Sequence, residues 1–194
     1  MITSAKTSTS EMIKVEQKLS VQCKTFAVDS SAIRSLDWDR SRFDIEFGLR
    51  NGTTYNSFII KGQKLAIIDT SHSKFEKLWI DQLLKEVNPQ DIDYLISSHT
   101  EPDHSGLIGN LISLNKNITV VGSKLALKFI EDQIHIPFKR LEVKSGEILD
   151  LGQNPDSGIN HNIEFISAPN LHWPDTIFSY DHGTNVLYLS LIHI

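Results

Sequence analysis

Residues 97–106 read SSHTEPDHSG, and this stretch is the most informative one for both the fold and the chemistry of the chain. It follows a short apolar run at residues 94–96, which predicts a buried strand, and it leads into an apolar helical pattern at residues 105–114. In α/β architectures, loops at the carboxyl ends of strands are where ligands bind. Within this loop, four side chains are of types that bind metals: His99, Glu101, Asp103 and His104.

The spacing of these side chains predicts two neighbouring metal positions. In an extended loop, residues two apart point to the same side, so His99 and Glu101 can converge on one ion. Asp103 and His104 fall where the chain turns into the helix, and they can face a second ion beside the first. Nitrogen and oxygen ligands without a thiolate suit iron, manganese or zinc. The alternative interpretation is a solvated loop whose polar residues cap the following helix.

Other histidines are candidates for the remaining ligands. His172 also follows a β-rich segment, and it is the best further candidate. His72 follows a strand too, but its neighbours predict a helix cap. Asp69 is a candidate either for supporting a ligand from behind or for a cap. We expect the other histidines, which lack ligand-rich neighbours, to be structural or exposed: His135, His161, His182 and His193.

The order of predicted elements indicates two mixed sheets with helices on the outside. Strands are predicted at residues 53–60, 65–68, 94–96 and 118–121, and again between residues 139 and 189, with helices at residues 75–87, 105–114 and 123–133. This order is not a regular βαβ alternation, so a doubly wound sheet is not expected. We expect buried helix faces formed by Phe75, Leu78, Trp79, Leu83 and Leu84, by Leu107, Ile108, Leu111 and Ile112, and by Leu125, Leu127, Phe129 and Ile130.

The composition is that of one globular domain. The chain has 194 residues, of which 40% are hydrophobic and 22% charged, and this mix fits neither disorder nor a coiled coil. A net charge of -5 argues against a protein that coats nucleic acid, and no apolar run reaches the roughly 18 residues of a transmembrane helix. The single cysteine, Cys23, fits a reducing compartment, so we expect a cytoplasmic protein. We expect residues 1–20 to be a flexible tail and residues 21–194 to form the domain.

The loop motif resembles that of the metallo-β-lactamase fold, an α+β architecture arranged as an αββα four-layer sandwich. Hydrolases of that superfamily usually carry histidine at the place of Glu101. The combination of His-x-Glu-x-Asp-His with the later run LHWPD at residues 171–175 resembles the flavodiiron proteins. Residues 34–40, 43–47 and 52–57 are similar to the branch found in cyanobacteria and other oxygenic phototrophs. The resemblance extends from about residue 21 to residue 188.

The resemblance implies reduction of O2 to water, or of NO to N2O, at a non-haem di-iron centre that serves as an electron sink in photoprotection. It implies that His99, Glu101 and His172 hold one iron and that Asp103 and His104 hold the other. A carboxylate at position 101 stabilises higher oxidation states of iron better than a neutral imidazole does. In the family, FMN is bound by a flavodoxin-like domain, which reaches the iron from the partner subunit of a head-to-tail homo- or heterodimer.

The end of the chain departs from the family pattern. Leu191 stands about where the family has a bridging aspartate, and the last histidine ligand lies beyond Ile194. We also expect the FMN domain and the flavin reductase module of the phototroph branch to be missing from this chain. Residues 190–194 look unlike the family, and His193 is a ligand candidate only by accident. We therefore expect a truncated domain with five of the seven protein ligands, partial metal loading, reduced stability and no electron delivery.

Two alternative functions remain open at this point. A zinc-dependent hydrolase of the same fold would use a bound hydroxide to attack an ester or amide. Glu101 and the run at residues 171–175 count against it. A non-catalytic subunit that pairs with a complete homologue fits the missing ligands, but it does not explain the intact first-iron ligands. O2 and NO are both candidate substrates.

Overall fold

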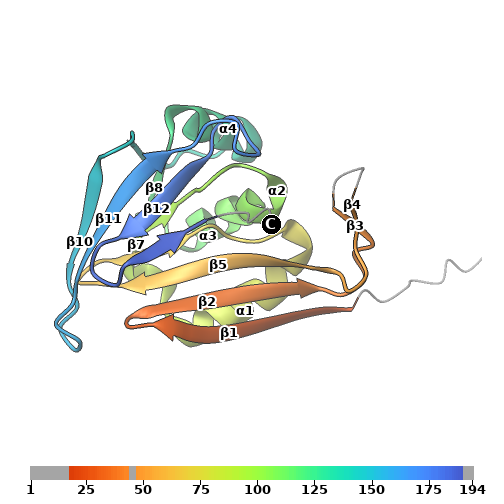
Figure 1. Ribbon diagram of the computed structural model, residues 1–194, viewed down its shortest axis with the longest axis horizontal. Helices are drawn as coiled ribbons and strands as arrows, with labels where there is room; N and C mark the ends of the chain where they lie inside the picture. The colour runs from red at the N-terminus through yellow and green to blue at the C-terminus, as the bar shows by residue number, and fades with distance from the viewer. Residues whose placement is uncertain (1–17, 44–46, 190–194) are drawn as a thin grey trace, which may run out of the picture.

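The structure is a computed structural model, and it describes residues 18–43 and 47–189. Two sheets pack face to face (Figure 1). The larger sheet has the order β1-β2-β5-β6-β7-β8-β9, and the smaller has the order β10-β11-β12-β13. The strands are β1 (Leu19–Ala27), β2 (Ser30–Asp37), β5 (Thr53–Lys61), β6 (Leu65–Ile68), β7 (Ile92–Ile96), β8 (Thr119–Gly122), β9 (Lys139–Glu142), β10 (Ile148–Gln153), β11 (Asn160–Ser167), β12 (Ile177–Asp181) and β13 (Val186–Tyr188). A separate ribbon pairs β3 (Arg42–Phe43) with β4 (Phe47–Gly48).

The larger sheet changes from antiparallel to parallel pairing at β6. Strands β1, β2, β5 and β6 pair antiparallel, whereas β6, β7, β8 and β9 pair parallel. The helices are α1 (Glu76–Glu86), α2 (Pro102–Ser105), α3 (Ile108–Leu114) and α4 (Lys124–Ile134), with 3-10 turns at Ser73–Phe75 and Pro89–Asp91. Because β6, β7 and β8 are parallel, the loops that leave their carboxyl ends gather at one edge of the sheet.

Alternation along the strands divides the core in two. Ile59, Ile67, Leu95 and Val120 are partners across neighbouring strands, and they face helices α1, α3 and α4. The next residues along the same strands, Ile60, Ile68, Ile96 and Val121, face the smaller sheet. Strands that are buried on both faces read as continuous apolar runs, as residues 65–68 do. Each fully buried side chain of this kind contributes about 1.5–3 kcal/mol to folding.

Helix α1 buries a narrower stripe than its sequence predicts. Phe75, Trp79 and Leu83 are fully buried, and the Trp79 Nε1–H donates to Ser57 Oγ at 2.8 Å. Leu78 and Leu84 are 39% and 51% exposed, so their predicted burial was wrong. Positions four apart form one stripe along a helix, and the two leucines lie about 100° to either side of it.

The predicted helix at residues 105–114 is confirmed only from Ile108, where α3 begins, because the separate helix α2 ends at Ser105. The break falls at Gly106, where a Cβ atom would lie 2.4 Å from the Pro102 carbonyl oxygen and 2.9 Å from that of Ser71. Glycine therefore lets the turn pack against the loop that follows β6. In α4, Leu127 and Ile130 are buried as predicted, but Leu125 is 38% exposed because it lies on the flank of the contact stripe.

The described residues form three layers of the predicted α+β sandwich: helices, the larger sheet and the smaller sheet. The predicted strands at residues 53–60 and 65–68 and the turn between them are confirmed. Strand β1 begins at Leu19, two residues before the predicted start of the domain. Residues 1–17 of the predicted tail lie outside the described residues. In the described part of the chain, no helix is both long and apolar enough to cross a membrane.

Candidate metal centre

The candidate centre lies where β7 ends, in the loop that leads to α2. The backbone N–H of Ser97 still donates to the Val121 carbonyl on β8, at 2.8 Å, which keeps the start of the loop in the sheet. Pro102 begins α2, and the residue before a proline is restricted to extended conformations. Glu101 accordingly has φ -60° and ψ 139°. The loop is therefore extended where the first two candidate ligands lie.

His99, Glu101 and His172 form the first ligand group. Each offers one ligand atom, and these atoms all lie within 4.8 Å of one another. Glu101 Oε2 lies 2.6 Å from His172 Nε2 and 3.3 Å from His99 Nε2. His99 is fully buried, whereas the other two are partly buried. The structure thus brings His172 to the loop that the sequence singled out, across 71 residues of chain.

His99, Asp103 and His104 form the second ligand group, again with ligand atoms within 4.8 Å of one another. Asp103 Oδ2 lies 3.5 Å from His104 Nε2, and the rings of His99 and His104 have centroids 4.4 Å apart. All three side chains are buried. The resemblance assigned His99 to one ion alone, but in the structure His99 lies within reach of both groups.

Two buried atoms of these groups have no hydrogen-bond partner within residues 18–43 and 47–189: His99 Nδ1 and Asp103 Oδ1. Buried polar atoms are normally paired, and an unpaired one costs about 1–3 kcal/mol. Imidazole nitrogens and carboxylate oxygens at these distances from one another are a donor set that iron, manganese or zinc accepts. The residues present therefore fit a metal, and a bound ion would engage atoms that the protein leaves unpaired.

The carboxylates of the two groups differ in their electrostatics. Burial alone would raise the pKa of Glu101, but the hydrogen bonds from His99 and His172 outweigh burial and hold the pKa at about 2. Burial raises the pKa of Asp103 above its ordinary value. Glu101 is therefore anionic at neutral pH and carries its charge between two imidazoles, where a cation would bind.

Asp69 supports His104 from behind. Its Oδ1 accepts from the backbone N–H of Ser98 at 2.7 Å, and its Oδ2 lies 3.2 Å from His104 Nδ1. Burial alone would lower the pKa of His104, but the hydrogen bond and the charge of Asp69 raise it. Asp69 is held at φ 56°, a left-handed conformation that is uncommon outside glycine. Of the two roles that the sequence left open for Asp69, the geometry favours support of a ligand.

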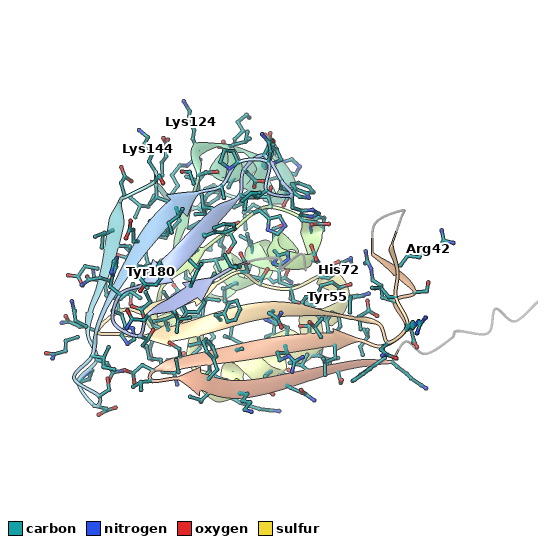
Figure 2. The ribbon with its side chains drawn as sticks, in the orientation of Figure 1. Arg42, Tyr55, His72, Lys124, Lys144 and Tyr180 are labelled. Carbon is teal, nitrogen blue, oxygen red and sulfur yellow. The ribbon has the colours of Figure 1, made fainter. Side chains whose placement is uncertain are left out.

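His72 belongs to a neighbouring cluster and caps a helical turn, as its sequence context predicts. Its Nδ1 accepts from the backbone N–H of Lys74 at 3.2 Å. Figure 2 shows His72 beside Tyr55, and their ring centroids lie 6.1 Å apart. Tyr55 donates to Asp37 Oδ2 at 3.0 Å, and Lys74 forms an ion pair with the same oxygen. Among the described residues, His72 is a member of neither ligand group.

The remaining histidines that the structure describes are structural or exposed, as the sequence predicts. His161 is buried, and carboxylates lie against both of its ring nitrogens. His182 is largely exposed and lies 2.8 Å from Glu164 Oε2. His135 ends α4 in a left-handed conformation with φ 52°. Leu191 and His193, on which the expectations about the missing bridge depend, lie outside the described residues.

Asp175 is a further residue of the site that the sequence patterns do not single out. Its side chain is 1% exposed, and its Oδ2 accepts from both the backbone N–H and the hydroxyl of Thr100, at 2.9 and 2.7 Å. Thr100 stands between two candidate ligands, and the bond spans 75 residues of chain. The only signal in the sequence is that Asp175 lies three residues after His172, within the run quoted for the resemblance.

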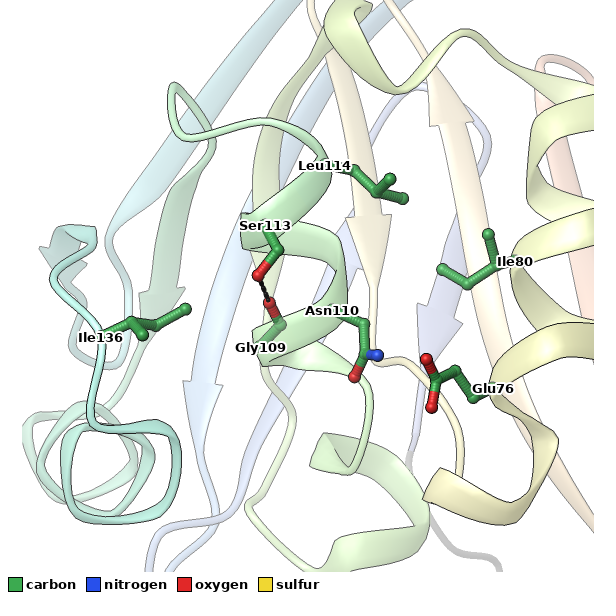
Figure 3. A pocket seen from close by; sticks show the side chains of 7 residues that line it. All are labelled: Glu76, Ile80, Gly109, Asn110, Ser113, Leu114 and Ile136. Atoms are coloured by element: carbon green, nitrogen blue, oxygen red, sulfur yellow. Dashed lines mark hydrogen bonds between the residues drawn. The ribbon is translucent and has the colours of Figure 1, made fainter.

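A cavity of about 490 Å³ lies elsewhere, in the helical layer between α1 and α3 (Figure 3). Its wall mixes apolar and polar side chains, and none of them is a candidate ligand. The lining residues are Glu76, Ile80, Gly109, Asn110, Ser113, Leu114 and Ile136. The cavity is therefore separate from the two candidate ligand groups.

Comparisons with known proteins agree with the fold and the loops. A family model described as ODP family beta lactamase matches residues 53–193, a range that includes both ligand loops. A diflavin flavoprotein relative from Nostoc sp. is 60% identical over 171 residues, which is 88% of this chain and 29% of that relative. The metal-soaked flavodiiron core of Synechocystis sp. matches with a TM-score of 0.79 at 29% identity, over 88% of this chain and 41% of that chain. Rubredoxin oxygen:oxidoreductase from Desulfovibrio gigas gives a TM-score of 0.74 at 27% identity, over 82% and 38% of the two chains.

Proposed function

The chain belongs to the ODP β-lactamase family and to the flavodiiron proteins, and from this premise we propose that it forms the di-iron centre of an oxidoreductase that reduces O2 to water. The observation that carries the proposal is the first ligand group. There, Glu101 lies between two imidazoles that hold its pKa at about 2. An anionic oxygen ligand at this place suits redox-active iron better than it suits a hydrolytic zinc site of the same fold.

The residues have separate tasks in this proposal. His99, Glu101 and His172 hold one iron, and Asp103 and His104 hold the other. When bound, iron supplies the one-electron chemistry and the affinity for O2 that protein side chains lack. Glu101 remains ionised and offsets the positive charge of the ions. Burial of the second group keeps water away from it.

The electron supply is also part of the proposal. We assign it to FMN, carried by a flavin domain of a partner subunit in a head-to-tail homo- or heterodimer. One relative is named as a diflavin flavoprotein, one solved structure as a flavodiiron core and another as an oxygen oxidoreductase. O2 is the favoured substrate for this reason, with NO as the second candidate. We place the protein in the cytoplasm, as an electron sink.

Anaerobic reconstitution tests the proposal. Metal-free protein is loaded with Fe²⁺ or with Zn²⁺, its metal content is measured by elemental analysis, and the chemically reduced samples are mixed with O2. We expect bound iron and O2 consumption by the iron-loaded sample alone, and we expect E101A to lose both. Preference for zinc together with hydrolysis of a thioester or lactam would contradict the proposal, as would failure to bind either metal.

A further inference from the structure

Thr100 is fixed in place although it binds no metal in the proposed function. It lies between His99 and Glu101 and is fully buried. Alternate residues of an extended segment point to opposite sides, so two ligands on one side place Thr100 on the other. The Thr100 side chain and backbone N–H both bind the carboxylate of Asp175. Any shift of Thr100 would move both neighbouring ligands.

The other side of Thr100 is held from the helical layer. Its carbonyl oxygen accepts from Ser105 Oγ at 2.9 Å and from Gln133 Nε2 at 3.2 Å. Ser105 belongs to α2 and Gln133 to α4. The peptide groups on both sides of Thr100 are therefore hydrogen-bonded, which leaves the segment between the two ligands little freedom.

Asp175 belongs to the loop that carries His172. The backbone N–H of Ile177 donates to the Ser98 carbonyl at 2.8 Å, and Ser123 Oγ donates to the Asp175 carbonyl at 2.9 Å. His172 itself has φ 82°, a strained left-handed conformation that persists only when its surroundings enforce it. The contacts of Asp175 therefore join this strained loop to the loop with His99 and Glu101.

We propose that Asp175 is a positioning residue that acts through Thr100 to hold the two ligand loops in the geometry of the first metal position. The inference rests on the proposed function for the identity of the metal. Asp175 Oδ2 makes both bonds to Thr100, while Oδ1 is buried and has no partner in the part of the chain that the structure describes. A buried carboxylate with one unpaired oxygen is unfavourable by itself, so its presence here calls for a role, and the two hydrogen bonds of Oδ2 to Thr100 supply one. The second group has a different support, Asp69 on His104.

A titration with Co²⁺, followed by its visible absorption, tests the role without any turnover. Wild type is compared with D175A, D175N, T100V and the double variant D175A/T100V. We expect D175A to weaken the first Co²⁺ affinity by about 10–100-fold, as loss of a residue that orients a ligand does. D175N should restore most of the affinity, because its amide oxygen can still accept from Thr100. T100V loses one hydrogen bond, so its affinity should fall by about fivefold.

The double variant separates this role from general destabilisation. If Asp175 acts through Thr100, D175A/T100V should bind no more weakly than D175A alone, because the bond is already lost. D181N is the matched control, since Asp181 is equally buried but contacts neither ligand loop. It should lower stability and leave Co²⁺ affinity unchanged. Unchanged affinity in D175A, no recovery in D175N, or additive effects in the double variant would each overturn the proposal.

Hydrogen exchange on the metal-free protein distinguishes this proposal from the proposed function. We expect D175A to speed exchange of the Thr100 backbone N–H, whereas D175N should leave it slow. Equal protection in D175A and wild type would overturn the positioning role directly. Wild-type protein that binds neither Co²⁺ nor Fe²⁺ would instead overturn the metal function, and the positioning role for a metal with it.

Discussion

Two buried clusters of histidine and carboxylate lie within the described part of the chain, and they differ in how completely their polar atoms are paired. In the cluster around His161, Nδ1 lies 2.8 Å from Asp181 Oδ2 and Nε2 lies 3.3 Å from Asp29 Oδ2. Thr184 Oγ1 donates to Asp181 Oδ2 at 2.6 Å, and Ser157 Oγ donates to Asp29 Oδ2. In the candidate metal centre, His99 Nδ1 and Asp103 Oδ1 have no partner among residues 18–43 and 47–189.

The difference shows what separates a structural cluster from a ligand site of similar composition. The His161 cluster ties the turn between β1 and β2, where Asp29 lies, to β11 and β12 of the other sheet. Its polar atoms are used within the protein, so it has little left to offer an ion. The candidate metal centre leaves one imidazole nitrogen and one carboxylate oxygen unpaired in a buried place, and a bound ion would offset the cost of burying them.

The largest expected effect is the loss of stability on breaking the structural cluster. H161A leaves Asp181 buried without its imidazole, and removal of one partner of a buried pair costs about 3–5 kcal/mol. We expect this decrease in the free energy of unfolding, measured by urea denaturation of the metal-free protein. The Co²⁺ affinity of the folded protein should not change.

H182A is the matched control for H161A. His182 also pairs with a carboxylate in the smaller sheet, but its side chain is 46% exposed. Exposed pairs contribute about 0–1 kcal/mol, so H182A should be close to wild type. Equal losses of unfolding free energy in H161A and H182A would contradict the prediction, because they would show that the buried pair stabilises the protein no more than the exposed pair does.

The next largest effect should fall on metal binding. H99A removes the one side chain that both ligand groups share, so both metal positions should weaken. We expect affinity for each Co²⁺ equivalent to fall by more than about 100-fold, beyond the range typical of residues that only orient a ligand. The stability of the metal-free protein should fall less than in H161A, because one ring nitrogen of His99 makes no hydrogen bond there. Wild-type metal content in H99A would refute the assignment of these residues.

A smaller effect is expected from the residue behind His104. D69N keeps the shape of the side chain but removes the charge that lies 3.2 Å from His104 Nδ1. Affinity for the second Co²⁺ should fall by about 10-fold, with a smaller change at the first position. Isothermal titration calorimetry with Co²⁺, which measures the affinity of each site, checks this difference. A larger loss at the first position would mean that the two groups are not supported separately.

The parts of the centre that could be predicted from the sequence are local. His99, Glu101, Asp103 and His104 are neighbours in the chain. Alternation in the extended part of the loop brings His99 and Glu101 to one side, and the turn into α2 places Asp103 and His104 beside them. The strands were predictable for a similar reason, since residues 53–60 and 65–68 show an apolar pattern between turn residues. The sequence makes His172 a candidate only through its position after a β-rich segment and through the resemblance of residues 171–175 to the flavodiiron proteins.

The unpredicted parts depend on contacts between distant segments. The bond from Thr100 to Asp175 spans 75 residues and that from His161 to Asp29 spans 132, and no local pattern encodes either. The exposure of Leu78 and Leu84 depends on how wide a stripe of α1 the sheet covers, which is a property of tertiary packing. Periodicity reports which side of a helix is apolar, but the neighbouring layer decides how much of that side is buried.

The smallest expected effect is a pH dependence that belongs to the structural cluster. The hydrogen bond to Asp181 raises the pKa of His161 above 6.5, although burial acts in the opposite direction. Burial would raise the pKa of Asp181, but the hydrogen bonds from His161 and Thr184 lower it below 3.8. His161 therefore contributes stability that is fully present below pH 6.5 and is lost as the pH rises through its raised folded pKa. Asp181 contributes stability that is present above pH 3.8 and is lost as the pH falls through its lowered folded pKa.

Both contributions are present in full together between pH 3.8 and pH 6.5. The free energy of unfolding of wild type minus that of H161Q should therefore be largest in this range and should decrease toward pH 9. Taking the difference cancels the titration of the metal ligands, which both proteins share. The change with pH should be smaller than the effect of H161A itself, because the neutral imidazole still packs and still donates one hydrogen bond. If the difference in unfolding free energy between wild type and H161Q grew above pH 7, His161 would be neutral in the folded protein. The His161 cluster and the candidate metal centre would then differ in the pairing of their polar atoms but not in charge.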